Sequence, residues 1–163
     1  MATPTTLPAS FTAGQVLTAA QMNDLRGAFR VLQVVSTTKT DTFSSASTSF
    51  ADVTGLSATI TPSATSSKIL VMWNVQCDHA SSNSGFGTKL LRDATAIYTS
   101  TNTYAVYATT AGDRSMSSFN YIDSPSSVAT ITYKVQVASD AGFAIDINDG
   151  NNQSQIVLME IAG

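Results

Sequence analysis

The sequence has little of the chemistry from which enzyme sites and disulfide frameworks are built. Its 163 residues include one cysteine, Cys77, one histidine, His79, and one glutamate, Glu160. An intrachain disulfide is therefore excluded, and any histidine-dependent catalysis would rest on His79 alone. Cys77 lies in an alternating apolar run and is predicted to be a small buried side chain. We expect no enzymatic activity, no cofactor and no bound metal.

Charge is also scarce. Charged residues make up 12% of the chain, about half the level of an average soluble domain, and the net charge is −3. The few basic residues form no run that could neutralise a phosphate backbone, so we expect no nucleic-acid partner. Serine and threonine fill the space, at roughly a quarter of the residues. Because charge is the usual source of long-range repulsion, such a surface suits packing against copies or neighbours.

The sequence contains no apolar run approaching the ~18 residues needed to span a bilayer, so we expect no membrane insertion. Its N-terminus lacks the basic and apolar regions of a signal peptide. Synthesis in a cytoplasm without a cleaved signal is therefore expected. A hydrophobic fraction of 43% is too high for a disordered chain, and the length suits one domain of ordinary size.

Residues 1–17 are predicted to form an extended arm. Pro4 and Pro8 fix φ and remove backbone donors, and few large apolar groups are available for a core. Such an arm is either disordered or laid against a partner.

A short helix is predicted over residues 18–29. Thr18 and Gln21 have the spacing of a capping box, and Met22, Leu25 and Phe29 recur at helical spacing. An isolated helix of about twelve residues is marginal in water, so it needs something to pack on. We therefore assign residues 1–30 as an attachment segment. Its candidate contact residues are its large apolar side chains: Phe11, Val16, Leu17, Met22, Leu25 and Phe29.

From residue 31 to residue 163 the apolar pattern changes to period two, which predicts strands. Turn clusters rich in Ser, Asn, Asp, Gly and Pro separate them. Many short strands without helices between them predict an all-β fold, an antiparallel jelly-roll β-sandwich. The predicted strands cover residues 31–38, 48–54, 56–61, 68–77, 86–93, 95–101, 104–109, 114–122, 128–137, 142–148 and 154–161.

The neighbourhood of His79 contains the residue types of a nucleophilic triad, in Cys77, Asp78 and Ser81. Adjacent strand residues point to opposite faces, so adjacency in sequence does not supply triad geometry. We predict that His79 is a surface residue at a strand end rather than a catalytic base.

The stretch from Asp146 to Asn152 places oxygen ligands at alternate positions and weakly resembles a calcium loop. The acid expected about six residues after Gly150 is missing. A hairpin turn explains the same residues, because Asn, Asp and Gly tolerate positive φ. The turn is the favoured interpretation, with Asp149 and Asn151 as candidates for a receptor or subunit contact.

Aromatic side chains gather in the middle of the chain, and core packing is the favoured interpretation for most of them. Tyr104 and Tyr107 lie in a Ser/Thr-rich stretch and are the members expected to be exposed. A sugar-binding platform or a subunit interface is the alternative use of such residues. The five aromatic residues are Tyr98, Tyr104, Tyr107, Phe119 and Tyr121.

Three stretches resemble structural proteins of tailed bacteriophages. Residues 11–23, Phe-Thr-Ala-Gly-Gln-Val-Leu-Thr-Ala-Ala-Gln-Met-Asn, resemble an N-terminal motif of such proteins. Residues 48–56 and 60–70 resemble the opening of fibre-like phage domains, and Ile156-Val-Leu-Met-Glu-Ile161 resembles their closing strand. The resemblance implies a jelly roll related in shape to C1q and tumour-necrosis-factor domains, and hence a homotrimer. Residues 78–125 carry no such resemblance.

This resemblance implies a virion protein, assembled in the cytoplasm of a host bacterium. We expect a homotrimeric tail-fibre or receptor-binding module, attached to tail proteins by residues 1–30, whose distal loops meet a host surface glycan. The alternative is a capsid decoration protein, of cement or head-fibre type, whose arm crosses the major capsid protein. A carbohydrate-binding or carbohydrate-active β-sandwich is the second alternative. Catalysis of that kind needs two facing carboxylates, and no motif supplies a partner for Glu160.

Overall fold

Two antiparallel sheets make up nearly all of the structure. The computed structural model describes residues 13–14, 16, 18–19, 22, 30–100 and 105–163. In this part of the chain the regular elements are strands, apart from helical residues at 19 and 22. None of the described helical residues belongs to a helix long and apolar enough to cross a membrane. The prediction of an all-β sandwich is confirmed.

Sheet A has six strands. Its order is β1-β11-β4-β10-β2, and β8 pairs with the other edge of β4. The strands are β1 (Val31–Lys39), β2 (Phe43–Ser45), β4 (Lys68–His79), β8 (Arg114–Asp123), β10 (Ile145–Ile147) and β11 (Ser154–Ile161).

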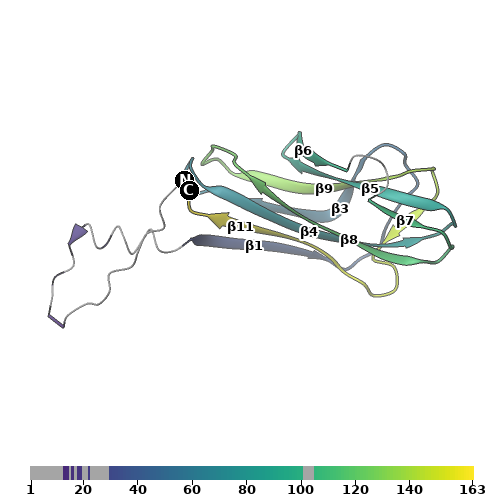
Figure 1. Cartoon of the computed structure of the whole chain (residues 1–163), viewed down its shortest axis with the longest axis horizontal. Helices are drawn as coiled ribbons and strands as arrows, with labels where there is room; N and C mark the ends of the chain where they lie inside the picture. Colours follow the sequence, from purple (N-terminus) through teal and green to yellow (C-terminus); the bar gives the residue numbers. More distant parts are fainter. Residues whose placement is uncertain (1–12, 15, 17, 20–21, 23–29, 101–104) are drawn as a thin grey trace.

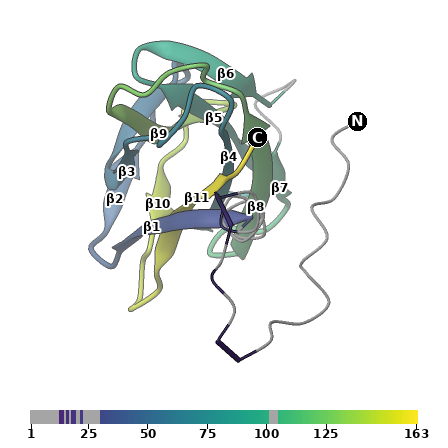
Figure 2. The same cartoon turned by 90° about the vertical axis from the view of Figure 1, so that its left-hand side faces the viewer.

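Sheet B has five strands. Its order is β3-β9-β5-β6. β7 pairs with the first residues of β5, and β6 pairs with the last ones. The strands are β3 (Ala51–Ile60), β5 (Ser84–Arg92), β6 (Thr95–Thr99), β7 (Val106–Ala108) and β9 (Ile131–Ser139). Figure 1 shows the two sheets facing each other with their strands along the long axis of the sandwich, and Figure 2 looks down that axis.

The strand order is that of a jelly roll. β10 and β11 both pair with β4, so they form one interrupted strand; β1 with β2, and β6 with β7, do the same. Each sheet then has four strand positions. Numbered along the chain, these positions run 1-8-3-6 in sheet A and 2-7-4-5 in sheet B. Apart from positions 4 and 5, which form the hairpin of β5 and β6, neighbours in a sheet are not consecutive in sequence, as two Greek keys require.

The core lies between the sheets, where alternate residues of each strand point inward. β4 shows this most clearly, because every second residue from Ile69 to His79 is buried and the residues between them are half-buried. The largest fully buried apolar side chains are Tyr133, Phe86, Leu56, Ile60, Ile69, Leu90, Ile145, Ile147, Ile156 and Leu158.

The chain enters and leaves the sandwich at one end, which we call the proximal end. The Ala162 N–H donates to the Arg30 carbonyl at 2.8 Å, so β1 begins beside the end of β11. Figure 1 shows β7 and the adjacent loops at the opposite end, which we call the distal end.

A buried carboxylate braces the proximal end. Glu160 on β11 is fully buried and accepts hydrogen bonds from the Gln33 amide, the Ser63 N–H, the Ser63 hydroxyl and the Ser67 hydroxyl, at 2.6–2.7 Å. These donors overcome the burial cost and hold the pKa of Glu160 at about 2, below its usual 4.5. Ser63 and Ser67 belong to the 60–70 stretch that resembles phage fibre domains, and Glu160 belongs to the resembling 156–161 stretch. Two of the three resembling stretches therefore meet in one contact.

Candidate functional site

The most unusual surface of the described molecule is the outward side of sheet A. We call the outward residues of β1, β11, β4 and β8 the outer face of sheet A. Large apolar side chains occupy its proximal part, and Val34 and Ile122 are 54% and 58% exposed. The others on β4 and β11 are half-buried. They are Leu70, Met72, Val157, Met159 and Ile161.

Strand register aligns these side chains into rows. Val34 lies opposite Met159, Met159 opposite Leu70, and Leu70 opposite Ile122, so one apolar row crosses all four strands. Val157 and Met72 lie opposite each other in the next row. Charged residues of β4 and β8 on this face stand only at the strand ends: Lys68 proximally, Asp78 and Arg114 distally. The middle of the face is therefore uncharged.

The outer face of sheet B provides the contrast. There Asp52 accepts hydrogen bonds from the Lys134 ammonium and the Gln136 amide, both at 2.7 Å. The hydroxyls of Thr59 and Thr132 lie 3.1 Å apart. This face carries the polar surface normal for a sheet facing water, whereas the outer face of sheet A carries polar residues only beyond its proximal apolar rows.

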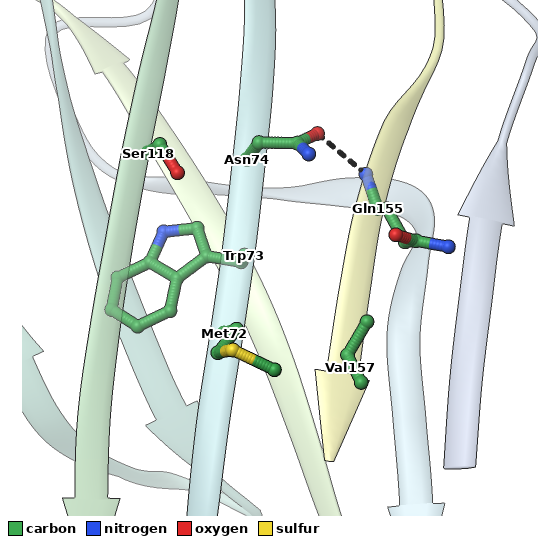
Figure 3. A pocket seen from close by; sticks show the side chains of 6 residues that line it. All are labelled: Met72, Trp73, Asn74, Ser118, Gln155 and Val157. Carbon is green, nitrogen blue, oxygen red and sulfur yellow. Dashed lines mark hydrogen bonds between the residues drawn. The ribbon is translucent and has the colours of Figure 1, made fainter. Parts of the chain in front are cut away.

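A shallow depression of about 170 Å³ lies on the outer face of sheet A, beside the apolar rows. Figure 3 shows Met72, Asn74 and Val157 among its lining side chains, with the Asn74 amide oxygen accepting from the Gln155 N–H at 2.9 Å. It is smaller than the ~300 Å³ at which small-molecule sites usually begin. We interpret it as a surface irregularity of an interaction face and not as a ligand site.

The sequence carried a signal for this face. The run from Ile156 to Ile161 is apolar at both inward and outward positions, interrupted only by Glu160. Near-continuous apolar runs are typical of strands covered on both faces, whereas a half-exposed strand alternates. The period-two pattern predicted strand β11 correctly. It did not predict that the outward side of β11 is apolar as well, which the continuous run indicates.

Candidate contact residues also lie toward the distal end. Tyr107 on β7 is 47% exposed, as predicted, and Figure 1 places β7 at that end. Tyr104 lies outside the described residues. Asp149 and Asn151 occupy the exposed loop between β10 and β11 of sheet A, whereas Tyr107 belongs to sheet B. The structure therefore places these candidates on different sheets.

Residues 148–152 form a turn with the predicted positive φ values, but not the predicted hairpin, because β10 and β11 both pair with β4 and not with each other. Asn148, Gly150 and Asn151 all have positive φ, at 62°, 69° and 66°. Such values favour Asn and Gly and account for the composition. Among the described residues no group of three or more His, Cys, Asp or Glu side chains is placed to hold a metal.

Arg114 ties this loop to sheet A. Its guanidinium pairs with the Asp78 carboxylate at 3.0 Å and lies 3.7 Å from that of Asp149. Burial, followed by the charges of Asp149 and Asp78, raises the pKa of the neighbouring Asp146.

The prediction of a surface His79 is wrong. His79 is fully buried, because it continues the inward positions of β4 after Val75 and Cys77. Its Nδ1 lies 3.3 Å from the Ser84 hydroxyl and its Nε2 2.9 Å from that of Ser115. Asp78 points to the opposite face, so these neighbours do not form the geometry of a triad. Cys77 is fully buried, as predicted, and burial raises the pKa of its thiol to about 12.

Acidification is expected to destabilise the distal end through His79. Burial lowers the pKa of His79 below its usual 6.5, and the weaker opposing influence of Asp78, Asp113 and Asp140 does not cancel this. Below about pH 6.5 the His79 imidazole is protonated in the unfolded chain but remains neutral in the folded protein. The free energy of unfolding therefore falls as the pH drops below about 6.5.

Urea unfolding of wild type and His79→Gln at pH 7 and pH 5 measures this effect. The variant should lose about 1–2 kcal/mol at pH 7 through poorer hydrogen bonding, and should show a smaller loss between pH 7 and pH 5. Glu160, with a pKa of about 2, stays ionised throughout that window. An equal pH dependence in the two proteins would contradict the assignment.

Most of the aromatic group belongs to the core, as predicted. Tyr98, Phe119 and Tyr121 pack against it as partly buried side chains. Trp73 lies between two of them, with ring centroids 5.5 Å from Tyr98 and 5.6 Å from Phe119. This cluster joins β4 and β8 of sheet A to β6 of sheet B.

Only part of the predicted attachment segment lies within the described residues. Val16 and Met22 are 86% and 47% exposed. The Met22 N–H donates to the Thr18 carbonyl at 3.0 Å, which is an α-helical hydrogen bond at the predicted helix start. The other four candidates, and the rest of the predicted helix, lie outside the described residues: Phe11, Leu17, Leu25 and Phe29.

No protein-family model matches the chain, and no curated protein sequence matches it. Solved structures that resemble it include three of infectious bursal disease virus: its Gx strain, a viral particle and a VP2 subviral particle. Their identities are 16%, 17% and 14%, and their TM-scores are 0.48, 0.47 and 0.44. Each covers 80% of this chain, which spans only 36–38% of theirs. The sandwich assignment rests on the strand order of this chain itself.

Proposed function

We propose that this chain is a bacteriophage virion structural protein without enzymatic activity: a homotrimeric tail-fibre or receptor-binding-type module attached through residues 1–30. The observation that carries the proposal is the two-ended layout of the sandwich. β1 begins and β11 ends at the proximal end, and β7, which carries the exposed Tyr107, lies at the distal end. A module held at one end and presenting loops at the other suits a link between particle and host.

The contact around Glu160 adds support. The 60–70 and 156–161 stretches resemble phage fibre domains, and Ser63 and Ser67 of the first stretch donate hydrogen bonds to Glu160 of the second. A shared buried contact gives these separated stretches a common structural reason to occur together. The resemblance therefore concerns how such a sandwich closes its proximal end.

A capsid decoration protein is the second candidate. The uncharged outer face of sheet A favours it, because a broad apolar surface suits close packing on a shell. A carbohydrate-active sandwich has less support. Glu160 is fully buried with its oxygens occupied by donors, and so lacks the open position that a catalytic carboxylate requires.

Imaging of the particle by cryo-electron microscopy, with this chain located on it, separates the candidates. Density on the tail or its fibres supports the tail module, whereas density at threefold capsid positions supports decoration. Deleting residues 1–30 should leave a folded sandwich that no longer joins the particle. An unfolded sandwich would show instead that the segment is core, and the attachment proposal would fail.

Tyr107→Ala provides the matched variant at the other end. It should join the particle normally and reduce adsorption to the host, because Tyr107 is exposed and far along the chain from the segment. The assignment would be wrong if Tyr107→Ala failed to join the particle while the protein lacking residues 1–30 joined it normally. The distal end would then be the one that attaches to the particle.

A further inference from the structure

We infer that the apolar outer face of sheet A is the docking surface for residues 18–29 of the same chain, contacted through Met22, Leu25 and Phe29. This deepens the proposed function and rests on it for the role of the arm. It assigns the helical part of the segment to the sandwich and leaves Phe11, Val16 and Leu17 for a partner.

The outer face of sheet A exposes an apolar surface of the kind that is normally buried against another segment or protein. The row near its proximal end, from Val34 across Met159 and Leu70 to Ile122, consists entirely of large apolar side chains in register. Two of these are more than half exposed in the described structure. Contiguous apolar surface of this kind on a soluble sandwich marks a site of contact. The polar outer face of sheet B shows that the chain does not leave both faces this way.

The segment begins beside this face. Arg30 is fixed by the hydrogen bond from Ala162, next to Ile161 on the outward side of β11. Val31 and Leu32 are 47% and 42% exposed, so the apolar surface continues to the point where the segment emerges. The segment is joined covalently to β1 through Arg30, so docking on this face is an intramolecular event.

The dimensions of segment and face agree. A twelve-residue helix is about 18 Å long, and four strand positions lie about 14 Å apart from first to last. Met22, Leu25 and Phe29 fall on one side of such a helix, spread over about 10 Å along its axis. That spread corresponds to about two strand spacings. The apolar stripe of the segment therefore matches the apolar row in length and in chemistry.

Charge and exposure in the segment point the same way. Met22 is 47% exposed within the described residues, although its backbone already makes a helical bond. In the predicted helix Asp24 falls opposite the apolar stripe, and Arg26 falls at its edge beside Met22. Docking would bury the stripe, leave Asp24 in water and let the long Arg26 side chain reach solvent from the edge.

Disulfide trapping in the full-length free protein tests the inference. Leu25→Cys combined with Leu70→Cys, on the central strand of sheet A, should give an intramolecular disulfide about tenfold faster than Leu25→Cys combined with Thr59→Cys. Thr59 is exposed on the outer face of sheet B and serves as the matched control. The native Cys77 is buried with a thiol pKa of about 12, so it supplies little reactive background.

A second measurement avoids the geometric demands of a disulfide. Labelling of Leu70→Cys by a polar maleimide should be slow in the full-length protein. It should accelerate about tenfold when Leu25 and Phe29 are both changed to Asp, because docking is then lost. Asn23→Asp is the control that adds charge away from the stripe and should leave the rate unchanged.

The inference would be overturned if the two cysteine pairs formed disulfides at equal rates. It would also be overturned if the labelling rate of Leu70→Cys were unchanged by the substitutions at Leu25 and Phe29. Disulfide-linked oligomers in place of the intramolecular product would overturn it in favour of docking onto a neighbouring copy. These experiments need no particle. Failure of the inference is therefore distinct from failure of the proposed function, which is read out by incorporation.

Discussion

Replacing Trp73 with alanine is expected to lower the free energy of unfolding by about 3–5 kcal/mol, the range for removing a large aromatic side chain from a core. Trp73 is 2% exposed, and its ring contacts both Tyr98 and Phe119, whose own centroids lie 5.3 Å apart. The substitution would leave a cavity where β6 of sheet B meets β8 of sheet A. Urea unfolding followed by circular dichroism measures the loss.

Two controls make the Trp73 result specific. Trp73→Phe keeps an aromatic ring and removes an indole N–H that has no hydrogen-bond partner among the described residues, so it should cost much less. Met116→Ala, at a side chain 58% exposed on the outer face of sheet A, should cost under about 1 kcal/mol. Comparable losses in Trp73→Ala and Met116→Ala would show that the aromatic cluster does not hold the sheets together.

Replacing Glu160 with glutamine is expected to cost about 2–3 kcal/mol at pH 7. The buried carboxylate accepts from Gln33, Ser63 and Ser67, and a neutral amide cannot accept from all of these donors. Asp52→Asn removes a carboxylate from the exposed ion pair with Lys134 and should cost under about 1 kcal/mol. Equal costs for the two variants would contradict a bracing role for Glu160.

The acid limb of the stability profile tests the same contact. The pKa of Glu160 is lowered from 4.5 to about 2, so its contribution is complete above about pH 4.5 and is lost as pH falls toward 2. Wild type should therefore lose stability more steeply than Glu160→Gln between pH 4.5 and pH 2. Denaturant titrations at pH 5 and pH 3 give the comparison. Parallel losses would show that Glu160 titrates normally.

The strand pattern of the fold was predictable because alternation is local. The predicted strands at 31–38, 114–122 and 154–161 match β1, β8 and β11 to within one residue at each end. The strand order itself follows from contacts between distant residues. The sequence analysis predicted the jelly-roll class, from strand number and the absence of intervening helices, and did not predict a strand order.

Two strand predictions missed for identifiable reasons. Residues 48–54 and 56–61 were predicted as separate strands because Gly55 interrupts the pattern, yet β3 runs from Ala51 to Ile60. The break is an irregularity between Asp52 and Ser57, with Gly55 at a φ of 84°, inside a continuous strand. β2 was missed, because three residues are too few to show a period.

The candidate site was less predictable than the fold. The sequence analysis placed Tyr107 correctly on the surface. It assumed that each strand has one solvent-exposed polar face, and so it did not identify the apolar outer face of sheet A. Four strands contribute to that row, and only their register brings Val34, Leu70 and Ile122 into line. His79 was misplaced for a related reason, because its serine partners come from two other strands.

The pairing of β1 with β11 has a mechanical consequence. If the arm is anchored and the distal loops are pulled, tension runs along β1 and loads its pairs with β11, from Val31 to Lys39, simultaneously in shear. Pulling residue 30 away from residue 162 would instead peel β1 from β11 one pair at a time, because β1 begins and β11 ends at the proximal end. The same bonds therefore resist force strongly in the first direction and weakly in the second. A module built this way is mechanically strongest along the line that joins an anchored particle to whatever its distal end holds.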